Sequence, residues 1–202
     1  TIIDDPAVAD KPCGLFMKMF QYTLQKDPRL SSVYSTIPRN ASYTSPEFQN
    51  EVIHHLANLI SESVVSELGD NWFTLMCDGT RDVSSLENIS IVLRYVDVTA
   101  TIRERLLCIV DTTELDAEGL TNVIMLHLEK HNIRLDRLLA QCYDGASVMS
   151  GTKGGIQALI QERLNRKVPY IHCFNHQLHL VVHYAVSSDK TVASYFNICQ
   201  QL

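Results

Sequence analysis

Trp72-Phe-Thr-Leu-Met-Cys-Asp78-Gly79 is an apolar run of strand length that ends in an aspartate and a glycine. A second run, Leu138-Leu-Ala-Gln-Cys-Tyr-Asp144-Gly145, has the same design. In open α/β sheets, ligands collect beyond the carboxyl ends of the strands. We therefore expect Asp78 and Asp144 to meet at one edge of a sheet if these two strands are neighbours.

The residues around these runs predict a mixed α/β sheet. Two further strands, over 88–96 and 103–110, follow the first at short intervals, which is typical of an antiparallel meander. Helices then alternate with strands, and such crossovers place the later strands parallel in the same sheet. The predicted elements after the meander are a helix over 118–131, a strand over 138–143, a helix over 153–164, a strand over 168–172 and a helix from about His176. The expected order is β-β-β-α-β-α-β-α.

Helices are also predicted ahead of the sheet. The spacing of apolar residues predicts a short helix over 14–26, and residues 33–43 read as a loop. A longer helix begins after Ser45, a capping residue, with Pro46 in its first turn, and it ends at Gly69. We expect its apolar stripe to be a packing surface.

Length and composition favour one core with a helical extension. The chain has 202 residues, of which 46% are hydrophobic, which is enough for one full core. We expect residues 1–70 to form the helical lead-in and residues 71–202 to form the core. No uninterrupted apolar run approaches the roughly 18 to 20 residues that span a bilayer, so a soluble protein without a membrane partner is expected.

The net charge and the cysteines bear on nucleic-acid binding and on the cellular compartment. Seventeen basic residues against 23 acidic ones give a net charge of -6, the wrong sign for a protein that grips nucleic acid over a broad face. The six cysteines are scattered without a Cys-x-x-Cys pair, which suits free thiols in the cytosol or nucleus. They are Cys13, Cys77, Cys108, Cys142, Cys173 and Cys199.

The two strand-end aspartates have two interpretations. Two carboxylates held close together repel each other unless a cation lies between them, and a hard divalent cation prefers oxygen ligands. Such a site can activate water and stabilise a leaving group in phosphoryl chemistry. Alternatively, both aspartates only form turns, because Asp-Gly is a common turn dipeptide. The residues alone leave both interpretations open.

Five stretches carry a family resemblance. They are Pro38-Arg-Asn-Ala-Ser-Tyr-Thr-Ser-Pro46, Cys77-Asp-Gly-Thr-Arg-Asp-Val-Ser-Ser85, Ile89-Ser-Ile-Val-Leu-Arg-Tyr-Val96, Gln141-Cys-Tyr-Asp-Gly-Ala-Ser-Val-Met-Ser-Gly151 and Ile171-His-Cys-Phe-Asn-His-Gln-Leu-His-Leu180. Together they resemble the hAT superfamily of transposases, in the branch found in zinc-finger MYM-type and THAP-domain proteins of animals. The similarity runs from about Leu15 to the last residues.

This resemblance implies a ribonuclease-H-like fold and an Asp-Asp-Glu triad that binds Mg²⁺ or Mn²⁺. Asp78 and Asp144 correspond to the first two members of the triad. The third, a glutamate, follows a large helical insertion in the family, so we expect it beyond Leu202. The chain would then be the N-terminal part of the core, and it would not catalyse transposition alone. For the full-length protein, the resemblance implies DNA at transposon ends as a partner, self-association through C-terminal parts, and a nuclear or nucleo-cytoplasmic location.

Cys173 and His176 match the family's Cys-x-x-His motif. We interpret this pair as structural, fixing the backbone near the active site, with His172 and His179 in support. Histidines 172, 176, 179 and 183 would share one helical face if the last helix began early, which suggests a zinc site. No second ligand pair with the usual finger spacing occurs in the sequence, so Zn²⁺ is not expected in this chain.

One position departs from the family pattern. Relatives carry an acidic residue after the first aspartate, in a pattern like Asp-Glu-Thr-Thr-Asp, whereas Gly79 takes that place here. Asp82 retains the second acid of the pattern and would support the site. Because Asp78 is present, the pattern is compatible with an active site, but many relatives are decayed or domesticated copies.

Two functions therefore compete. The first is metal-dependent cleavage and transfer of DNA strands in the full-length protein. The second is a domesticated, inactive copy whose core binds DNA or protein partners as a nuclear scaffold or regulator. The basic cluster of Arg163, Arg166 and Lys167 is either a solvated helix end or a weak contact with the DNA backbone.

Overall fold

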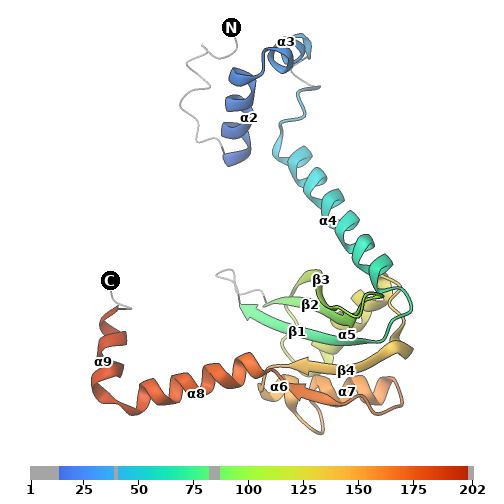
Figure 1. Ribbon diagram of the computed structural model, residues 1–202, viewed down its shortest axis with the longest axis vertical. Helices are drawn as coiled ribbons and strands as arrows, with labels where there is room; N and C mark the ends of the chain where they lie inside the picture. Colours follow the sequence, from blue (N-terminus) through green and yellow to red (C-terminus); the bar gives the residue numbers. More distant parts are fainter. Residues whose placement is uncertain (1–13, 39–40, 82–86, 200–202) are drawn as a thin grey trace. The chain divides into compact units, whose positions relative to one another are not determined.

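A computed structural model describes residues 14–38, 41–81 and 87–199 of the chain (Figure 1). The chain divides into two compact units, residues 1–58 and 59–202. Asp82, one of the predicted supporting residues, lies outside the described residues. Among the residues described, every helix is too short or too polar to span a bilayer.

The first unit contains two short helices, α2 (Leu15–Lys26) and α3 (Pro28–Thr36), and the start of a third. The Phe20 and Tyr34 rings meet edge to face with their centroids 5.0 Å apart, which packs α2 against α3. The Asp27 carboxylate accepts hydrogen bonds from the backbone amides of Arg29 and Leu30 and thereby caps α3. The loop predicted over 33–43 is consequently wrong for its first four residues, which continue this capped helix.

The long helix α4 (Pro46–Leu68) has the predicted ends. The Ser45 hydroxyl accepts a hydrogen bond from the Phe48 amide at 3.2 Å, and Gly69 has a φ of +52°, a conformation that favours glycine. Its C-terminal part belongs to the second unit, where Val64 and Leu68 are buried in the core.

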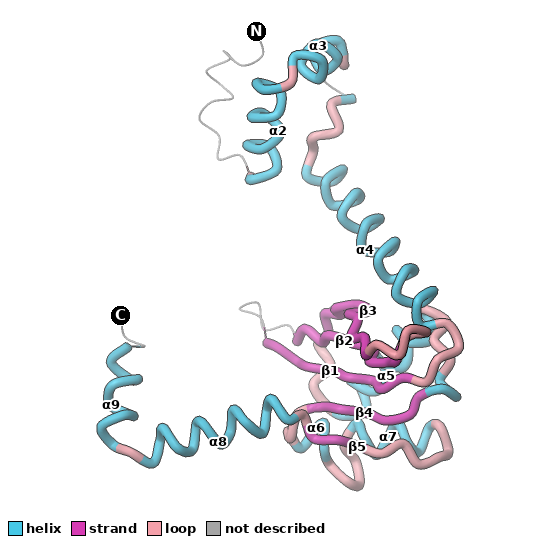
Figure 2. The backbone as a smooth tube through the Cα atoms, in the orientation of Figure 1, coloured by secondary structure: helices cyan, strands magenta, loops and turns pink. Residues whose placement is uncertain are grey.

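The second unit is built on a five-stranded sheet with the order β3-β2-β1-β4-β5 (Figure 2). Its strands are β1 (Phe73–Arg81), β2 (Glu87–Val96), β3 (Ile102–Thr112), β4 (Leu138–Tyr143) and β5 (Tyr170–His172). The first three pair antiparallel, whereas β4 pairs parallel with both β1 and β5. The mixed sheet predicted for a ribonuclease-H-like fold is therefore confirmed.

Helices cover one face of this sheet and enclose the core. Alternate residues of β1 and β2 are buried, as expected for strands with one face against a core. They pack with α5 (Ala117–Lys130) and α7 (Ile156–Arg163) in one hydrophobic cluster. The fully buried members include Leu75, Ile91, Ile124, Leu128 and Ile160.

Several predicted bounds in the second half shift by a few residues. A short helix, α6 (Ser147–Ser150), precedes α7, and α7 begins at Ile156, not at 153. A Cβ built on Gly155 would lie 2.4 Å from the Gly151 nitrogen, so the turn between the two helices brings these two glycine backbones into contact. The remaining elements are the short η3 turn (Leu135–Arg137), α8 (Phe174–Ser188) and α9 (Lys190–Cys199).

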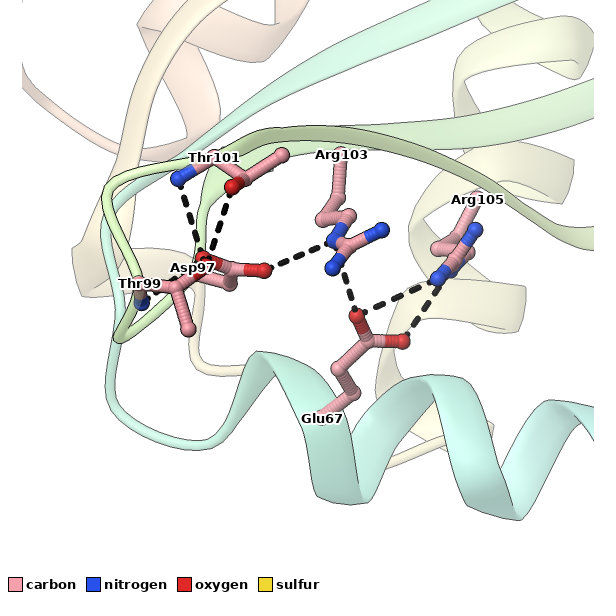
Figure 3. A network of polar contacts seen from close by, with 6 residues as sticks. All are labelled: Glu67, Asp97, Thr99, Thr101, Arg103 and Arg105. Atoms are coloured by element: carbon pink, nitrogen blue, oxygen red, sulfur yellow. Dashed lines mark hydrogen bonds and ion pairs between the residues drawn. The ribbon is translucent and has the colours of Figure 1, made fainter.

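The turn between β2 and β3 is held by the Asp97 carboxylate (Figure 3). One of its oxygens accepts hydrogen bonds from the backbone amides of Thr99 and Thr101, and the other pairs with Arg103 Nε at 2.7 Å. The side chain is only 10% exposed. The Thr99 hydroxyl donates a further hydrogen bond to Asp97 at 2.6 Å. This bond, and then those from the backbone amides and Arg103, hold the pKa of Asp97 well below its usual range.

The same network ties β3 to the end of α4. Glu67 of α4 pairs with Arg105 at 3.0 Å and with Arg103 at 3.6 Å (Figure 3). The hydrogen bond from Arg105 lowers the pKa of Glu67. Side chains two residues apart on a strand point to the same side of the sheet. Arg103 and Arg105 can therefore both reach Glu67.

Candidate metal centre at the carboxyl ends of β1 and β4

The strands that carry Asp78 and Asp144 are parallel neighbours. Their ladder ends at the pair Met76 and Cys142, and each aspartate lies two residues further along its strand direction. The two residues are therefore at equivalent positions along adjacent strands. They lie toward the carboxyl ends of these strands, where ligands of α/β proteins bind.

Asp78 is a strand residue. It lies inside β1 opposite Ser90 of β2, whose hydroxyl donates a hydrogen bond to the Asp78 carbonyl at 3.1 Å. Its side chain is exposed, whereas the preceding Cys77 is buried toward the helices. The interpretation of Asp78-Gly79 as a turn is wrong, because both residues belong to the β1–β2 ladder.

Asp144 follows β4 directly and does form a turn. Its Oδ1 accepts a hydrogen bond from the Ala146 amide at 3.1 Å, and its carbonyl accepts one from the Tyr170 hydroxyl at 2.7 Å. Burial, and then the nearby Asp144 carboxylate, raise the pKa of Tyr170. The half-buried Asp144 is thus fixed by β5 on one side and by the start of α6 on the other.

A cleft of about 300 Å³ opens beside Asp144. It is lined by Gly79, Glu87, Leu115, Leu120, Asp144, Ala146, Val148 and Met149. The Asp78 side chain is not among these residues, since the neighbouring Gly79 faces the cleft from β1. The structure therefore brings Asp144 into the cleft and leaves Asp78 on the adjacent strand.

Glu87 is a second acid in this cleft, and no motif or spacing in the sequence predicted it. It begins β2 and lies diagonally opposite Gly79 across the ladder. A Cβ built on Gly79 would lie 2.8 Å from Glu87 Oε1, so the glutamate carboxylate covers the glycine. The only signal was the glycine at a position where relatives carry an acid.

The oxygen donors here suit a hard cation. Mg²⁺ is held by one or two carboxylates and retains several waters, and Asp144 with Glu87 in one solvent-accessible cleft meets that need. Asp78 lies on the neighbouring strand and does not line this cleft. Within the described residues, however, these three acids do not form a cluster with ligand atoms close enough for a single ion.

The Cys-x-x-His motif lies next to this cleft. The Cys173 amide donates to the Tyr143 carbonyl at 2.8 Å, and the Gln177 side chain donates to the His172 carbonyl at 3.2 Å. The motif thus joins the end of β5 and the start of α8 to the end of β4. Burial, and then the Cys173 thiol, raise the pKa of Cys142.

The four histidines do not share one helical face. His172 is the last residue of β5, and α8 begins only at Phe174, so His176, His179 and His183 alone are helical. The four histidines were expected on one helical face only if the helix began before His172. Because His172 belongs to β5, the helix begins too late for this arrangement. The rings of His172 and His176 still lie 5.5 Å apart, and those of His179 and His183 lie 6.4 Å apart.

His172 packs directly on the loop that follows Asp144. A Cβ built on Gly145 would lie 2.5 Å from the His172 Cε1 atom, so the ring occupies the space of a side chain at that position. Its Nε2 is buried, and no hydrogen-bond partner for it is found among the described residues. The ring therefore shapes the backbone beside Asp144.

The basic cluster has partners within the chain. Arg163 forms an ion pair with Glu118 and a hydrogen bond with Asn122, and Arg166 donates to the carbonyls of Leu135 and Leu138. Contact of this cluster with DNA stays a prediction.

A family model supports the assignment of this sheet. The model described as "ZMYM1/FAM200, RNase-like domain" matches residues 8–155, well over half of the chain. The matched range includes both Asp78 and Asp144, together with the first four strands of the sheet. It confirms the resemblance to the zinc-finger MYM-type branch of transposase-like proteins. The chain therefore belongs to the ZMYM1/FAM200 family of RNase-like domains.

Proposed function

We propose that this chain is the N-terminal part of a transposase-type core that cleaves and transfers DNA strands with divalent cations in the full-length protein. The observation that carries the proposal is the juxtaposition of Asp78 and Asp144 at equivalent positions on parallel neighbouring strands, beside a cleft that also contains Glu87. This arrangement gathers oxygen ligands at the edge of the sheet where ligands bind.

In this proposal, each residue has a separate role. Asp144 and Glu87 hold the cation from within the cleft. Asp78, which lies outside the cleft on the neighbouring strand, joins these ligands only when the side chains rearrange around the ion. When bound, Mg²⁺ or Mn²⁺ activates water and stabilises the leaving oxygen of a phosphodiester. His172 and Tyr170 keep Asp144 in place, the first by packing on Gly145 and the second through its hydrogen bond to the Asp144 carbonyl.

The test is a titration of the reduced, chelator-treated chain with Mn²⁺, followed by thermal unfolding. A bound ion at about 100 times its Kd stabilises the folded state by about 2.7 kcal/mol, so we expect a saturable rise in Tm. Asp78→Asn, Asp144→Asn and Glu87→Gln should each weaken this rise. Glu162→Gln, an exposed acid on α7, serves as the matched control and should retain it. An equal rise in Asp144→Asn and in the unmodified chain would contradict the proposed site.

A second candidate is a domesticated protein whose core is an inactive scaffold for DNA or protein in the nucleus. Gly79 in place of the family's acid favours it, as does the lack of a three-carboxylate cluster among the residues described. The two candidates differ in one assay. The full-length protein, incubated with Mn²⁺ and duplex DNA carrying its own transposon ends, should release nicked strands only under the first proposal, and Asp144→Asn should abolish this release.

A further inference from the structure

A second group of potential metal ligands lies away from the cleft, between β3 and α5. Cys108 of β3 faces His127 in the last turn of α5 and His131, the residue that caps this helix. One ligand atom from each side chain lies within 4.8 Å of the other two, and Cys108 Sγ is 3.9 Å from His127 Nδ1. All three residues are half-buried.

The fold explains why these side chains converge. Cys108 lies opposite Ile91 of β2, and directly opposed residues of an antiparallel pair point to the same face of the sheet. Ile91 is fully buried under the helices, so Cys108 also faces them. His127 and His131 are four residues apart and therefore lie on the same side of α5. The helical bond from the His131 amide to the His127 carbonyl, at 3.2 Å, maintains this spacing at the helix end.

The spacing is close to that of a zinc site. With Zn–S near 2.3 Å and Zn–N near 2.0–2.1 Å, tetrahedral angles separate ligand atoms by roughly 3.4–3.6 Å. The distance from Cys108 Sγ to His127 Nδ1 exceeds this range by only a few tenths of an ångström. The separations from the His131 ligand atom to the other two are at most 4.8 Å. Binding of Zn²⁺ would therefore draw these half-buried side chains closer together.

The ligand atoms of this group favour one kind of metal ion. One thiolate and two imidazoles suit Zn²⁺, whereas Mg²⁺ and Ca²⁺ prefer oxygen ligands. The cation would also lie at the C-terminal end of α5, where the helix dipole favours positive charge.

We propose that Cys108, His127 and His131 bind one Zn²⁺ ion, with water in the fourth position, and that this ion fastens the edge strand β3 to the end of α5. The site is separate from the carboxylate cleft and does not depend on the function proposed above. It is also distinct from the Cys-x-x-His motif, which does not form a three-ligand group in the part of the chain that the structure describes.

Without a metal, the same three residues would only be a packed, hydrogen-bonded contact, and a titration separates the two cases. The reduced, metal-free chain is titrated with Zn²⁺ against a chromophoric chelator, and with Co²⁺ as a spectroscopic probe. We expect one equivalent of tight binding, a thiolate-to-cobalt charge-transfer band, and the intense visible absorption of tetrahedral Co²⁺.

The variants Cys108→Ser and His131→Gln should each bind Zn²⁺ at least about tenfold more weakly, since even partners of metal ligands contribute tenfold or more. Cys142→Ser, another half-buried thiol in the sheet, and His176→Gln, in the Cys-x-x-His motif, are the controls and should bind as the unmodified chain does. Asp144→Asn should also bind Zn²⁺ normally, which keeps this test independent of the Mn²⁺ site.

Folding of each variant is checked in chelator by circular dichroism and thermal unfolding. If Cys108→Ser does not fold, His131→Gln decides, because this residue caps the helix and lies outside the hydrophobic core. Unchanged Zn²⁺ affinity in a folded His131→Gln variant would overturn the proposal. So would a Co²⁺ complex that lacks the sulfur charge-transfer band.

Discussion

At the scale of single residues, two glycines control the surroundings of the candidate metal centre. Gly79 and Gly145 follow the two aspartates, and in each case another side chain occupies the space of a Cβ. Glu87 lies over Gly79, and the His172 ring lies over Gly145. Neither glycine is required by a positive φ, since Gly69 is the glycine with that conformation among the described residues. The close approach of Glu87 to Gly79 and of His172 to Gly145 explains why neither position has room for a side chain.

The Gly145→Ala substitution tests this close approach. The new methyl group would lie 2.5 Å from His172 Cε1, so the half-buried ring must move. We expect the free energy of unfolding to fall by about 1–3 kcal/mol, as for other overpacked sites. Chemical denaturation measures the change. Gly154→Ala is the control, because no atom lies within 4 Å of its Cβ position, and it should change stability by less than about 0.5 kcal/mol.

Asp97 gives a prediction for pH dependence. Its pKa is lower in the folded chain than the roughly 3.9 of an unfolded aspartate, so its ionised form stabilises the fold above that pH. This contribution is lost as the pH falls below about 3.9 toward the folded-state pKa. Asp97→Asn should therefore be less stable than the unmodified chain at pH 7, and the difference should shrink below pH 3.9.

Urea denaturation at a series of pH values checks the Asp97 prediction. Glu162→Gln, which removes an exposed acid on α7, should leave the shape of the stability curve unchanged. A constant difference between Asp97→Asn and the unmodified chain at all pH values would mean that the lost contacts do not depend on the carboxylate charge.

At the scale of elements, β4 is joined to its neighbours by a buried glutamine. Gln141 is fully buried, and its amide nitrogen donates to the carbonyls of Gln157 on α7 and Val168 ahead of β5, both at 2.9 Å. Its oxygen accepts from the Tyr143 hydroxyl at 3.0 Å. The Gln141 side chain thus joins β4 to α7 and to the segment ahead of β5, in addition to the ladder that pairs Gln141 with Tyr170.

Replacing Gln141 by leucine should destabilise the sheet strongly. The change removes three buried hydrogen bonds and leaves two carbonyls and the Tyr143 hydroxyl without these partners. We expect a loss of about 3 kcal/mol in the free energy of unfolding. Tyr143→Phe, which removes one of the three bonds, should lose about 1 kcal/mol in the same denaturation experiment. Equal losses in both variants would show that Gln141 acts only through Tyr143.

Helix α5 links the two sites proposed above. Leu120, near the start of this helix, lines the carboxylate cleft. At the other end, His127 lies in the last turn and His131 caps the helix. The Asp116 carboxylate fixes the start of the helix by accepting from the Gly119 amide at 2.7 Å.

At the scale of the whole molecule, charge sets the expectation for DNA binding. The net charge of -6 repels a polyanion, and two of the three residues in the basic cluster already have partners within the chain. We expect the 202-residue chain to bind a labelled duplex with a Kd weaker than about 10 µM at physiological salt, within the range of non-specific binding. Fluorescence anisotropy measures this affinity, and submicromolar binding would contradict the expectation that other parts of the parent protein supply the grip.

Local patterns were sufficient for most elements. Apolar runs of strand length predicted the strands, and β4 has the predicted bounds. Caps and glycines predicted the ends of α4, because these signals act within one turn of a helix. The start of α7 was missed because the contact between Gly151 and Gly155 depends on how two helices meet.

Local periodicity and contiguous motifs were enough to predict the mixed sheet, the family and the position of Asp144 at the end of β4. The same signals predicted that Asp78 ends its strand, which is wrong, because β1 continues to Arg81 in its ladder with β2. Only the tertiary structure revealed Glu87 beside Gly79 and the group of Cys108, His127 and His131. Cys108 and His127 are 19 residues apart on different elements, so no spacing rule connects them. Strand pairing and helix packing create both groups, and these long-range contacts leave no periodic pattern in the sequence.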